Sequence, residues 1–282
     1  MGLMPFRPNG FAVLLVPALL AYVATIAALS GQRPPSIAPE LSARLPLAAQ
    51  VIMAGGDRYL AANMAGFRVL VADTFRMKSD EFATQAQLQK DISWLNPAHE
   101  DNYYIAAAIL SQPHLIPAAQ YVLRRAADAR PRDWTPLFYY GFNLYHFEKN
   151  PAAAAQALLE GVSRTQDVAE QWGLQALAAR WIERGYRTDE AARLVGQMAD
   201  NAPPGTFRRY MKFRAERLVQ LDRLKTMALK FRDMYGRSPT RIEDLVDARL
   251  IERVPVDPLG VGFAIDTAGE PGFRDTVKAG NR

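Results

Sequence analysis

The stretch YYIAAAILSQPHLIPAAQYVLRRAADARP, residues 103–131, contains two apolar segments separated by a polar turn. In each segment, bulky or alanine side chains recur three or four residues apart, which is the period of one face of an α-helix. Alanine in the second segment allows two helices to cross closely, and proline ends it. The positions that set this pattern are Tyr103, Ala106, Ala107, Leu110, Ala119, Leu123, Ala126 and Pro131. The stretch therefore predicts a hairpin of two antiparallel helices.

The same pattern recurs downstream with a period of about 34 residues. From Pro131 to Pro203 is 72 residues, or two slightly lengthened units. The recurring positions are Leu137, Tyr140, Gly141, Leu144, Ala154, Leu158, Gly161, Ala178, Ala179, Ile182, Ala191, Val195 and Met198. Repeated hairpins stack into a solenoid, because each buries its apolar face only against its neighbours. A generic helical bundle, which lacks a concave groove, is the alternative.

On these residues, the region 80–204 resembles a tetratricopeptide-repeat (TPR) protein with three to four units. The resemblance implies an all-α solenoid in which the first helix of each pair lines a groove that binds a protein segment. The groove residues that it implies are Tyr104, Gln112, Phe138, Phe142, Tyr145, His146, Arg180 and Arg184, with Glu183 as a further polar member. Core packing between units is the alternative role for each aromatic side chain.

Helical periodicity extends along most of the chain, and Pro, Asn, Asp or Gly interrupts it. The predicted helices are 41–54, 57–75, 80–95, 101–112, 116–129, 134–147, 151–163, 168–185, 188–200 and 205–235.

The N-terminal segment Phe11–Leu29, FAVLLVPALLAYVATIAAL, is 19 residues long and almost wholly apolar. As a helix it would span roughly 28 Å, close to the hydrocarbon thickness of a bilayer. It predicts a transmembrane anchor after a short cytoplasmic tail, with the bulk of the chain in the periplasm. Two alternatives stay open: a signal peptide cleaved before Gly31, and a buried helix of a soluble protein.

The predicted helix 205–235 is strongly basic. Residues 207–237 carry ten basic and three acidic side chains, a net charge of +7, whereas the whole chain carries +5. Apolar residues from Phe207 to Tyr235 predict a buried stripe on this helix. Its basic surface comprises Arg208, Arg209, Lys212, Arg223 and Lys230, and the charge count also includes Arg214 and Arg217. Such a surface suits an anionic lipid or an acidic partner, and a solvated helix face is the alternative.

The last segment, 238–282, predicts a small helix-turn-strand module. Thr240 and Glu243 have the spacing of a capping box, and a turn and a strand at 263–266 follow. The P-x-D-P-x-G pattern at 255–260 resembles a motif near the end of type II secretion pseudopilins, where it is structural. Asp257 is expected to cap its turn, as is Asp266 in the next turn, with Ca²⁺ binding as the alternative. The end of the chain, from Gly272, is expected to be a loose tail.

Composition argues against several classes of protein. The chain has no cysteine and only three histidines, so it offers no thiolate nucleophile and little for a metal centre. It contains no HExxH, GxSxG or phosphate-loop motif, because the segment at 54–57, AGGD, is a helix break. No pattern of a nucleic-acid-binding fold accompanies the basic charge. We therefore expect no catalysis, cofactor, metal, nucleic acid or small-molecule substrate.

Together these features predict five parts: an anchor at 1–33, a linker and first helices at 34–79, TPR-like repeats at 80–204, a basic helix at 205–237 and a C-terminal module at 238–282. The predicted function is a scaffold for protein partners, anchored in a bacterial inner membrane by residues 11–29. Its setting would be an envelope assembly, such as a pilus, a type II secretion-like system or an associated ABC exporter. The alternatives are a periplasmic enzyme with helical repeats and a soluble secreted binding protein.

Overall fold

The computed structural model describes residues 17–26, 45–75 and 77–280, and this part of the chain is mostly helical. A helix covers residues 17–26. The elements that follow are α2 Leu47–Met53, α3 Arg58–Val71, α4 Ser79–Leu95, α5 Glu100–Ile109, α6 Ile116–Ala129, α7 Thr135–His146, α8 Pro151–Val162, α9 Val168–Gly185, α10 Thr188–Asn201, α11 Thr206–Tyr235, α12 Glu243–Asp247, β1 Phe263–Ile265, β2 Pro271–Phe273 and α13 Arg274–Gly280.

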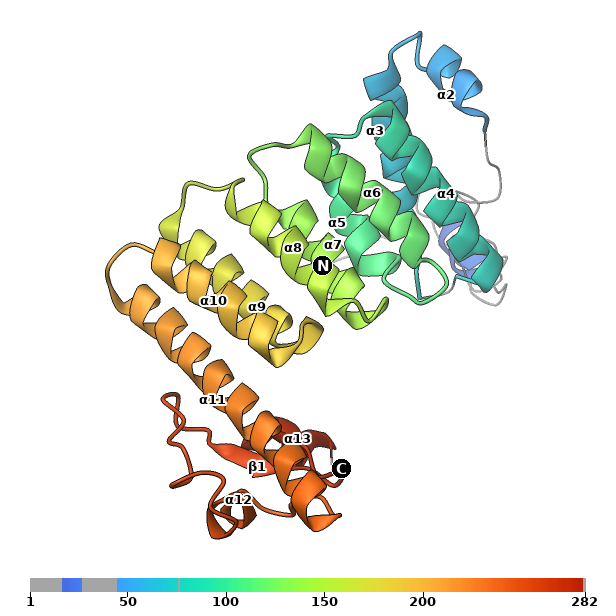
Figure 1. Ribbon diagram of the computed structural model, residues 1–282. Coiled ribbons are helices and arrows are strands. Elements are labelled where there is room, and N and C mark those ends of the chain that lie inside the picture. Colours follow the sequence, from blue (N-terminus) through green and yellow to red (C-terminus); the bar gives the residue numbers. More distant parts are fainter. Residues whose placement is uncertain (1–16, 27–44, 76, 281–282) are drawn as a thin grey trace, which may run out of the picture.

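From α3 to α11, the helices stack side by side in the order of the sequence (Figure 1). Each packs mainly against the helix before it and the helix after it, as expected of stacked hairpins. Aromatic pairs also join alternate helices: Tyr104 of α5 contacts Tyr139 of α7, and Tyr145 of α7 stacks on Trp181 of α9. In the other row, Arg124 of α6 forms an ion pair with Glu160 of α8. The helices therefore form two rows.

Short polar signals set the helix boundaries. Asp57 accepts hydrogen bonds from the N–H groups of Tyr59 and Leu60 at the start of α3, and Asp167 caps α9 in the same way. Proline lies in the first turn of α6, α7 and α8, where its missing N–H costs nothing. The glycines at 55 and 56 have positive φ angles, so the AGGD segment is a helix break as predicted. Each predicted helix is present from residue 45 onward, but α3 ends at Val71 instead of 75 and α5 at Ile109 instead of 112. Residues 41–44 lie outside the described part.

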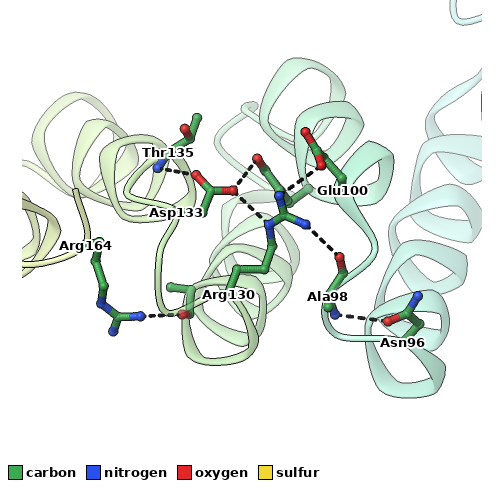
Figure 2. A network of polar contacts seen from close by, with 9 residues as sticks. Asn96, Ala98, Glu100, Arg130, Asp133, Thr135 and Arg164 are labelled. Atoms are coloured by element: carbon green, nitrogen blue, oxygen red, sulfur yellow. Dashed lines mark hydrogen bonds and ion pairs between the residues drawn. The ribbon is translucent and has the colours of Figure 1, made fainter. Parts of the chain in front are cut away.

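Two arginines that are 34 positions apart form hydrogen bonds between units. Arg130, at the end of α6, donates to the carbonyl oxygen of Ala98, 3.1 Å away. Arg164, 34 positions later and just after α8, donates to the carbonyl oxygen of Ala127 at 2.8 Å (Figure 2). In both cases, an arginine after the second helix of one unit binds backbone near the end of the second helix of the previous unit. The donors therefore follow the 34-residue period of the sequence, whereas their acceptors, Ala98 and Ala127, are 29 positions apart.

The stack is tight because small side chains lie where helices cross. The alanines at 119, 126, 154, 178 and 191 are all buried, as the pattern requires. Close crossing places many atoms in contact and leaves few voids between helices.

The long helix α11 belongs to two hydrophobic cores. Met211 and Leu218 in its first part pack into the core shared by α7 to α10. Leu224 and Phe231 in its second part pack with the C-terminal module. Most of the predicted stripe is buried, but Tyr235 at its end is exposed. Figure 1 shows α11 running from the helical stack to the module that contains α12, β1 and α13.

The expectation of a loose C-terminal tail is wrong. Residues 271–273 form β2, which pairs antiparallel with β1 so that Phe273 faces Phe263, and α13 follows directly. The turn between the strands is closed by Asp266, whose carboxylate accepts hydrogen bonds from the N–H groups of Ala268 and Glu270. Asp257 likewise accepts from Leu259 and Gly262, so both acids have the turn-capping role that was expected.

The predicted capping box at Thr240 has a different acidic partner. The carboxylate of Asp244, not Glu243, accepts hydrogen bonds from the backbone N–H and the hydroxyl of Thr240, at 2.8 and 3.0 Å. Glu243 is the first residue of α12, so Asp244 lies one position deeper and reaches back over the turn. The backbone hydrogen bond from Thr240 and the contacts with Arg241 lower the pKa of Asp244 to about 2.

This carboxylate makes the stability of the C-terminal module depend on acid pH. Because the pKa of Asp244 is lower in the folded than in the unfolded chain, its carboxylate stabilises the fold at pH values above the unfolded pKa. This stabilisation is lost as the pH falls towards 2. We expect Asp244→Asn to lower the free energy of unfolding by about 1 kcal/mol at pH 7, the usual loss for a cap. That difference should shrink between pH 4 and pH 2, as thermal unfolding at a series of pH values would measure. A difference that stays constant with pH would contradict this role, and Asp247→Asn, at an exposed carboxylate on the same helix, is the control.

None of the helices described, from 17–26 to α13, is both long and apolar enough to cross a membrane. Within the predicted anchor, the described helix at 17–26 has every side chain exposed. The rest of that anchor, 11–16 and 27–29, lies outside the described residues.

Candidate functional site

The first helices of the repeats carry a band of aromatic side chains, which we call the aromatic band. It consists of Tyr104, Trp134, Phe138, Tyr139, Phe142, Tyr145, His146 and Trp181. On α5 and the first half of α7, ring centroids lie 6.2 Å apart for Tyr104 and Tyr139, and 5.5 Å for Phe138 and Tyr139. The rings meet edge to face, a favourable geometry for aromatic pairs.

The second half of α7 continues the band towards α9. Phe142 and His146 lie one helical turn apart, with ring centroids 4.2 Å from each other. Tyr145 stacks on Trp181 of α9 at 4.9 Å, and the guanidinium of Arg184 donates a hydrogen bond to the Tyr145 hydroxyl. Phe138, Phe142 and Tyr145 are four and three residues apart, so they share one face of α7.

The members of the aromatic band differ in exposure: some lie at the surface and others pack partly against the core. Tyr104 is 41% exposed and Phe142 36%, and His146 is exposed as well. Phe138 and Tyr145 are half-buried and pack against the main core, so the core role that was the alternative applies in part to both. Tyr104, Phe142 and His146 are therefore the aromatic side chains of the predicted groove that a partner can reach most easily.

The polar residues predicted for the groove lie in different settings. Arg180 and Arg184 are exposed on α9 beside the band. Gln112 is half-buried and its side-chain amide donates to the carbonyl of Ile109, which stabilises the end of α5. Glu183 is largely buried and does not belong to an open surface: it forms an ion pair with Arg214 of α11.

Sequence reasoning missed three members of the band, namely Trp134, Tyr139 and Trp181. Trp134 precedes α7 and contacts Phe138, and its indole N–H donates to Glu170 at the start of α9, 2.9 Å away. These residues fall outside the positions that the repeat resemblance assigns to the groove. For Trp134 and Tyr139, the only signal was the local density of aromatic residues between 134 and 147, and Trp181 on α9 had no such signal.

A polar cluster joins α5 to the turn before α7 (Figure 2). Asp133 accepts hydrogen bonds from the Tyr103 hydroxyl at 2.9 Å, from Arg130 at 2.8 Å and from the backbone of Thr135 at 3.0 Å. Arg130 also forms an ion pair with Glu100. Burial opposes ionisation of Asp133, but these hydrogen bonds outweigh it and hold its pKa below the ordinary value. Burial and the bonds to Tyr104 and Asp133 raise the pKa of Tyr103.

Those pKa shifts favour a structural role for the cluster. A tyrosine that keeps its proton and a carboxylate that keeps its charge hold one donor and one acceptor fixed. A general acid or base needs a pKa near the working pH, and both shifts lead away from it. The cluster therefore orients α5 relative to α7.

Two buried ion pairs correct the view of α11 as a solvated basic helix. Arg214 forms an ion pair with Glu183 and donates to the Tyr210 hydroxyl at 2.8 Å. Arg217 pairs with Asp257 at 3.3 Å and lies over the ring of Phe273. All four charged side chains of these pairs are nearly buried, so Arg214 and Arg217 add nothing to the basic surface.

The remaining basic residues of α11 lie mostly at the surface. Arg209, Lys212, Arg223 and Lys230 are exposed, whereas Arg208 is half-buried and donates to the carbonyl of Ala202 in the preceding turn. Four of the five residues predicted for the basic surface are therefore exposed.

Several hollows lie elsewhere on the described part of the molecule, including one of about 560 Å³ between residues 238–240 and the turn at 265–269. One of about 670 Å³ lies between α2 and α3, one of about 320 Å³ between α3 and α5, and one of about 510 Å³ between α11 and the loop 251–256. None of the eight predicted groove residues lines them. Within the described part of the chain, no group of three or more His, Cys, Asp or Glu side chains has the geometry of a metal site.

Comparison of the chain with protein-family models, with curated proteins and with solved structures finds no match.

Proposed function

We propose that this protein is a scaffold of the tetratricopeptide type, which binds a segment of a protein partner along the aromatic band. The observation that carries the proposal is the set of exposed aromatic side chains on first helices of successive units. Tyr104 lies on α5, and Phe142 and His146 lie on α7. Arg130 and Arg164, 34 positions apart, each bind backbone of the preceding unit, which supports the repeat type.

The chemistry of the band suits a helix or an extended peptide. Aromatic side chains with few rotatable bonds lose little entropy when a partner covers them, and they dominate binding energy at many interfaces. The exposed cations Arg180 and Arg184 lie beside the band on α9 and would favour a partner segment that carries acidic side chains. Binding alone, without chemistry, is the activity that this arrangement supports.

We further propose that residues 11–29 hold the scaffold in a bacterial inner membrane, with the bulk of the chain in the periplasm. The support is the sequence, which has no charged residue from Pro8 to Gln32. The P-x-D-P-x-G pattern supports a setting in an envelope assembly, such as a pilus or secretion system or an associated exporter. The same chain would then present the aromatic band to a partner at a fixed place on the membrane.

A cross-linking pull-down from membranes tests the binding proposal. Tyr104→Glu with Phe142→Glu places two charges on the band at exposed positions, so the fold is retained. We expect the double variant to lose a cross-linked partner that the wild type captures. Phe138 is left unchanged because it packs against the core.

Leu159→Glu is the matched control, because Leu159 is 37% exposed but lies on α8, a second helix. It should capture the same partners as the wild type. An unchanged partner list for the double variant, with circular dichroism like that of the wild type, would refute the role of the band.

A further inference from the structure

Helix α3 is apolar on two opposite sides, and the fold covers only one of them. Ala61, Ala65 and Val69 pack on α4 in a small core. On the other side, Phe67 is 64% and Leu70 65% exposed. The further apolar side chains exposed on α3 are Tyr59, Leu60, Met64 and Val71. A helix that is apolar all round normally lies in an interior, so α3 has an unpaired apolar face.

The exposed face extends beyond α3 on both sides. Ile52 and Met53 of α2 are exposed, and Phe75, after the end of α3, is fully exposed. The hollow of about 670 Å³ between α2 and α3 is lined by Leu45, Met53, Met64, Phe67 and Arg68, among others. We call these exposed residues of 52–75 the α2–α3 face. Apolar patches of this kind mark surfaces that bind something other than water.

Charge identifies what the α2–α3 face binds. The only charged residues of α3 are Arg58 and Arg68, and both are basic. The acids at its two ends are Asp57 and Asp73, whose carboxylates accept hydrogen bonds from backbone N–H groups of the adjacent turns. Residues 57–73 therefore carry no net charge, with both arginines on the helix and both acids just beyond its ends. An exposed apolar face that includes aromatic residues, on a helix whose own charged residues are arginines, suits a membrane interface.

The position of the face in the chain supports the same occupant. The uncharged apolar segment 11–29 is separated from the start of α3 at Arg58 by 28 residues, 30–57. A segment of that length, even partly folded, leaves α3 within reach of a bilayer that holds residues 11–29. An anchored chain would thus keep this face beside lipid.

We propose that the α2–α3 face lies on the surface of an anionic bilayer, with Leu60, Met64 and Phe67 below the headgroups and Arg58 among them. The Arg58 guanidinium lies over the ring of Tyr59 and donates to its hydroxyl, so the pair presents one apolar and one charged group at headgroup level. This inference rests on the membrane placement proposed above. It adds a second contact with the bilayer, which would fix the tilt of the helical stack.

The absence of cysteine makes a site-specific test direct. Phe67→Cys in the full chain gives a single thiol for a fluorescent label that reports the polarity around it. Because Phe67 is largely exposed, the change should leave the fold intact. Leu159→Cys on α8 provides the matched control. Both labelled proteins are reconstituted into vesicles of equal parts phosphatidylcholine and phosphatidylglycerol, with and without nitroxide-labelled lipid.

We expect a blue-shifted label at position 67 that nitroxide lipid quenches several-fold more than the label at position 159. Two results overturn the inference while leaving the anchor intact: flotation of the protein with vesicles while the label at 67 stays in water, and a shift of that label that depends on protein concentration without lipid. The latter would mean that a second copy covers the face. Failure of the full chain to float with vesicles would overturn both the anchor and this contact.

Discussion

Replacing Arg214 with methionine will lower the free energy of unfolding by about 3–5 kcal/mol, the usual loss when a buried ion pair loses one partner. The side chain of Arg214 is 6% exposed and that of Glu183 is 11% exposed, so water cannot replace the missing guanidinium. The substitution also removes the hydrogen bond to Tyr210. Urea unfolding followed by circular dichroism measures the effect.

The pH dependence of Arg214→Met provides a second readout. Burial raises the pKa of the Glu183 carboxyl, and Arg214, Arg217 and Arg180 oppose that rise. Without Arg214 the folded-state pKa rises further above its unfolded value. Stability from such an acid is present below the unfolded pKa and is lost as pH rises through the folded one. The difference in free energy of unfolding between the wild type and Arg214→Met should therefore grow from pH 5 to pH 8.

Two further variants separate the ion pair from general damage to α11. Arg209→Met removes an exposed arginine five positions earlier and should change stability by less than about 0.5 kcal/mol. The double variant Arg214→Met with Glu183→Leu replaces both charges with apolar groups and should recover most of the loss. A single Arg214→Met variant as stable as Arg209→Met would contradict the role assigned to the pair.

The second large effect is expected for Gly185→Ala at the end of α9. An added Cβ would lie 2.6 Å from the backbone nitrogen of Ala152 and 3.0 Å from the carbonyl carbon of Pro151. These atoms start α8 and cannot rotate away, so the two helices must move apart. We expect a loss of about 1–3 kcal/mol, typical of overpacking, in thermal unfolding.

Gly173→Ala in the same helix is the matched control. No atom lies within 4 Å of the Cβ that it would add, so the change only reduces the freedom of the unfolded chain. It should raise stability by about 0.5–1 kcal/mol. The two substitutions are chemically identical and should differ in sign. If both stabilise the protein, the contact between α8 and α9 is looser than described.

The sequence predicted the existence of the helices well because many of their boundaries have a local cause. Capping acids, prolines in first turns and the AGGD break all act within a few residues. The C-terminal strands were only partly predictable. Each has three residues, too few for an alternating pattern, and β2 exists because Phe273 reaches Phe263 across a turn.

The role of the arginines on α11 depended on distant partners. Arg214 precedes Leu218 by four residues and Arg217 precedes Leu221 by four, so both lie on the buried stripe. That spacing was a signal that these charges are not at the surface. The partners Glu183 and Asp257 lie on other elements, and no local pattern could identify them. The exposed apolar face of α3 was not predicted either. The spacing of apolar residues along a helix does not show which of its sides packs against a neighbouring helix.

Helix α11 also fixes the distance between the helical stack and the C-terminal module. Thirty helical residues span about 45 Å, and no flexible joint separates the part that packs on α10 from the part that holds the C-terminal module. The continuous helix therefore holds the C-terminal module at a fixed distance and angle from the aromatic band. A partner that touches both would be selected by its dimensions as well as by its chemistry.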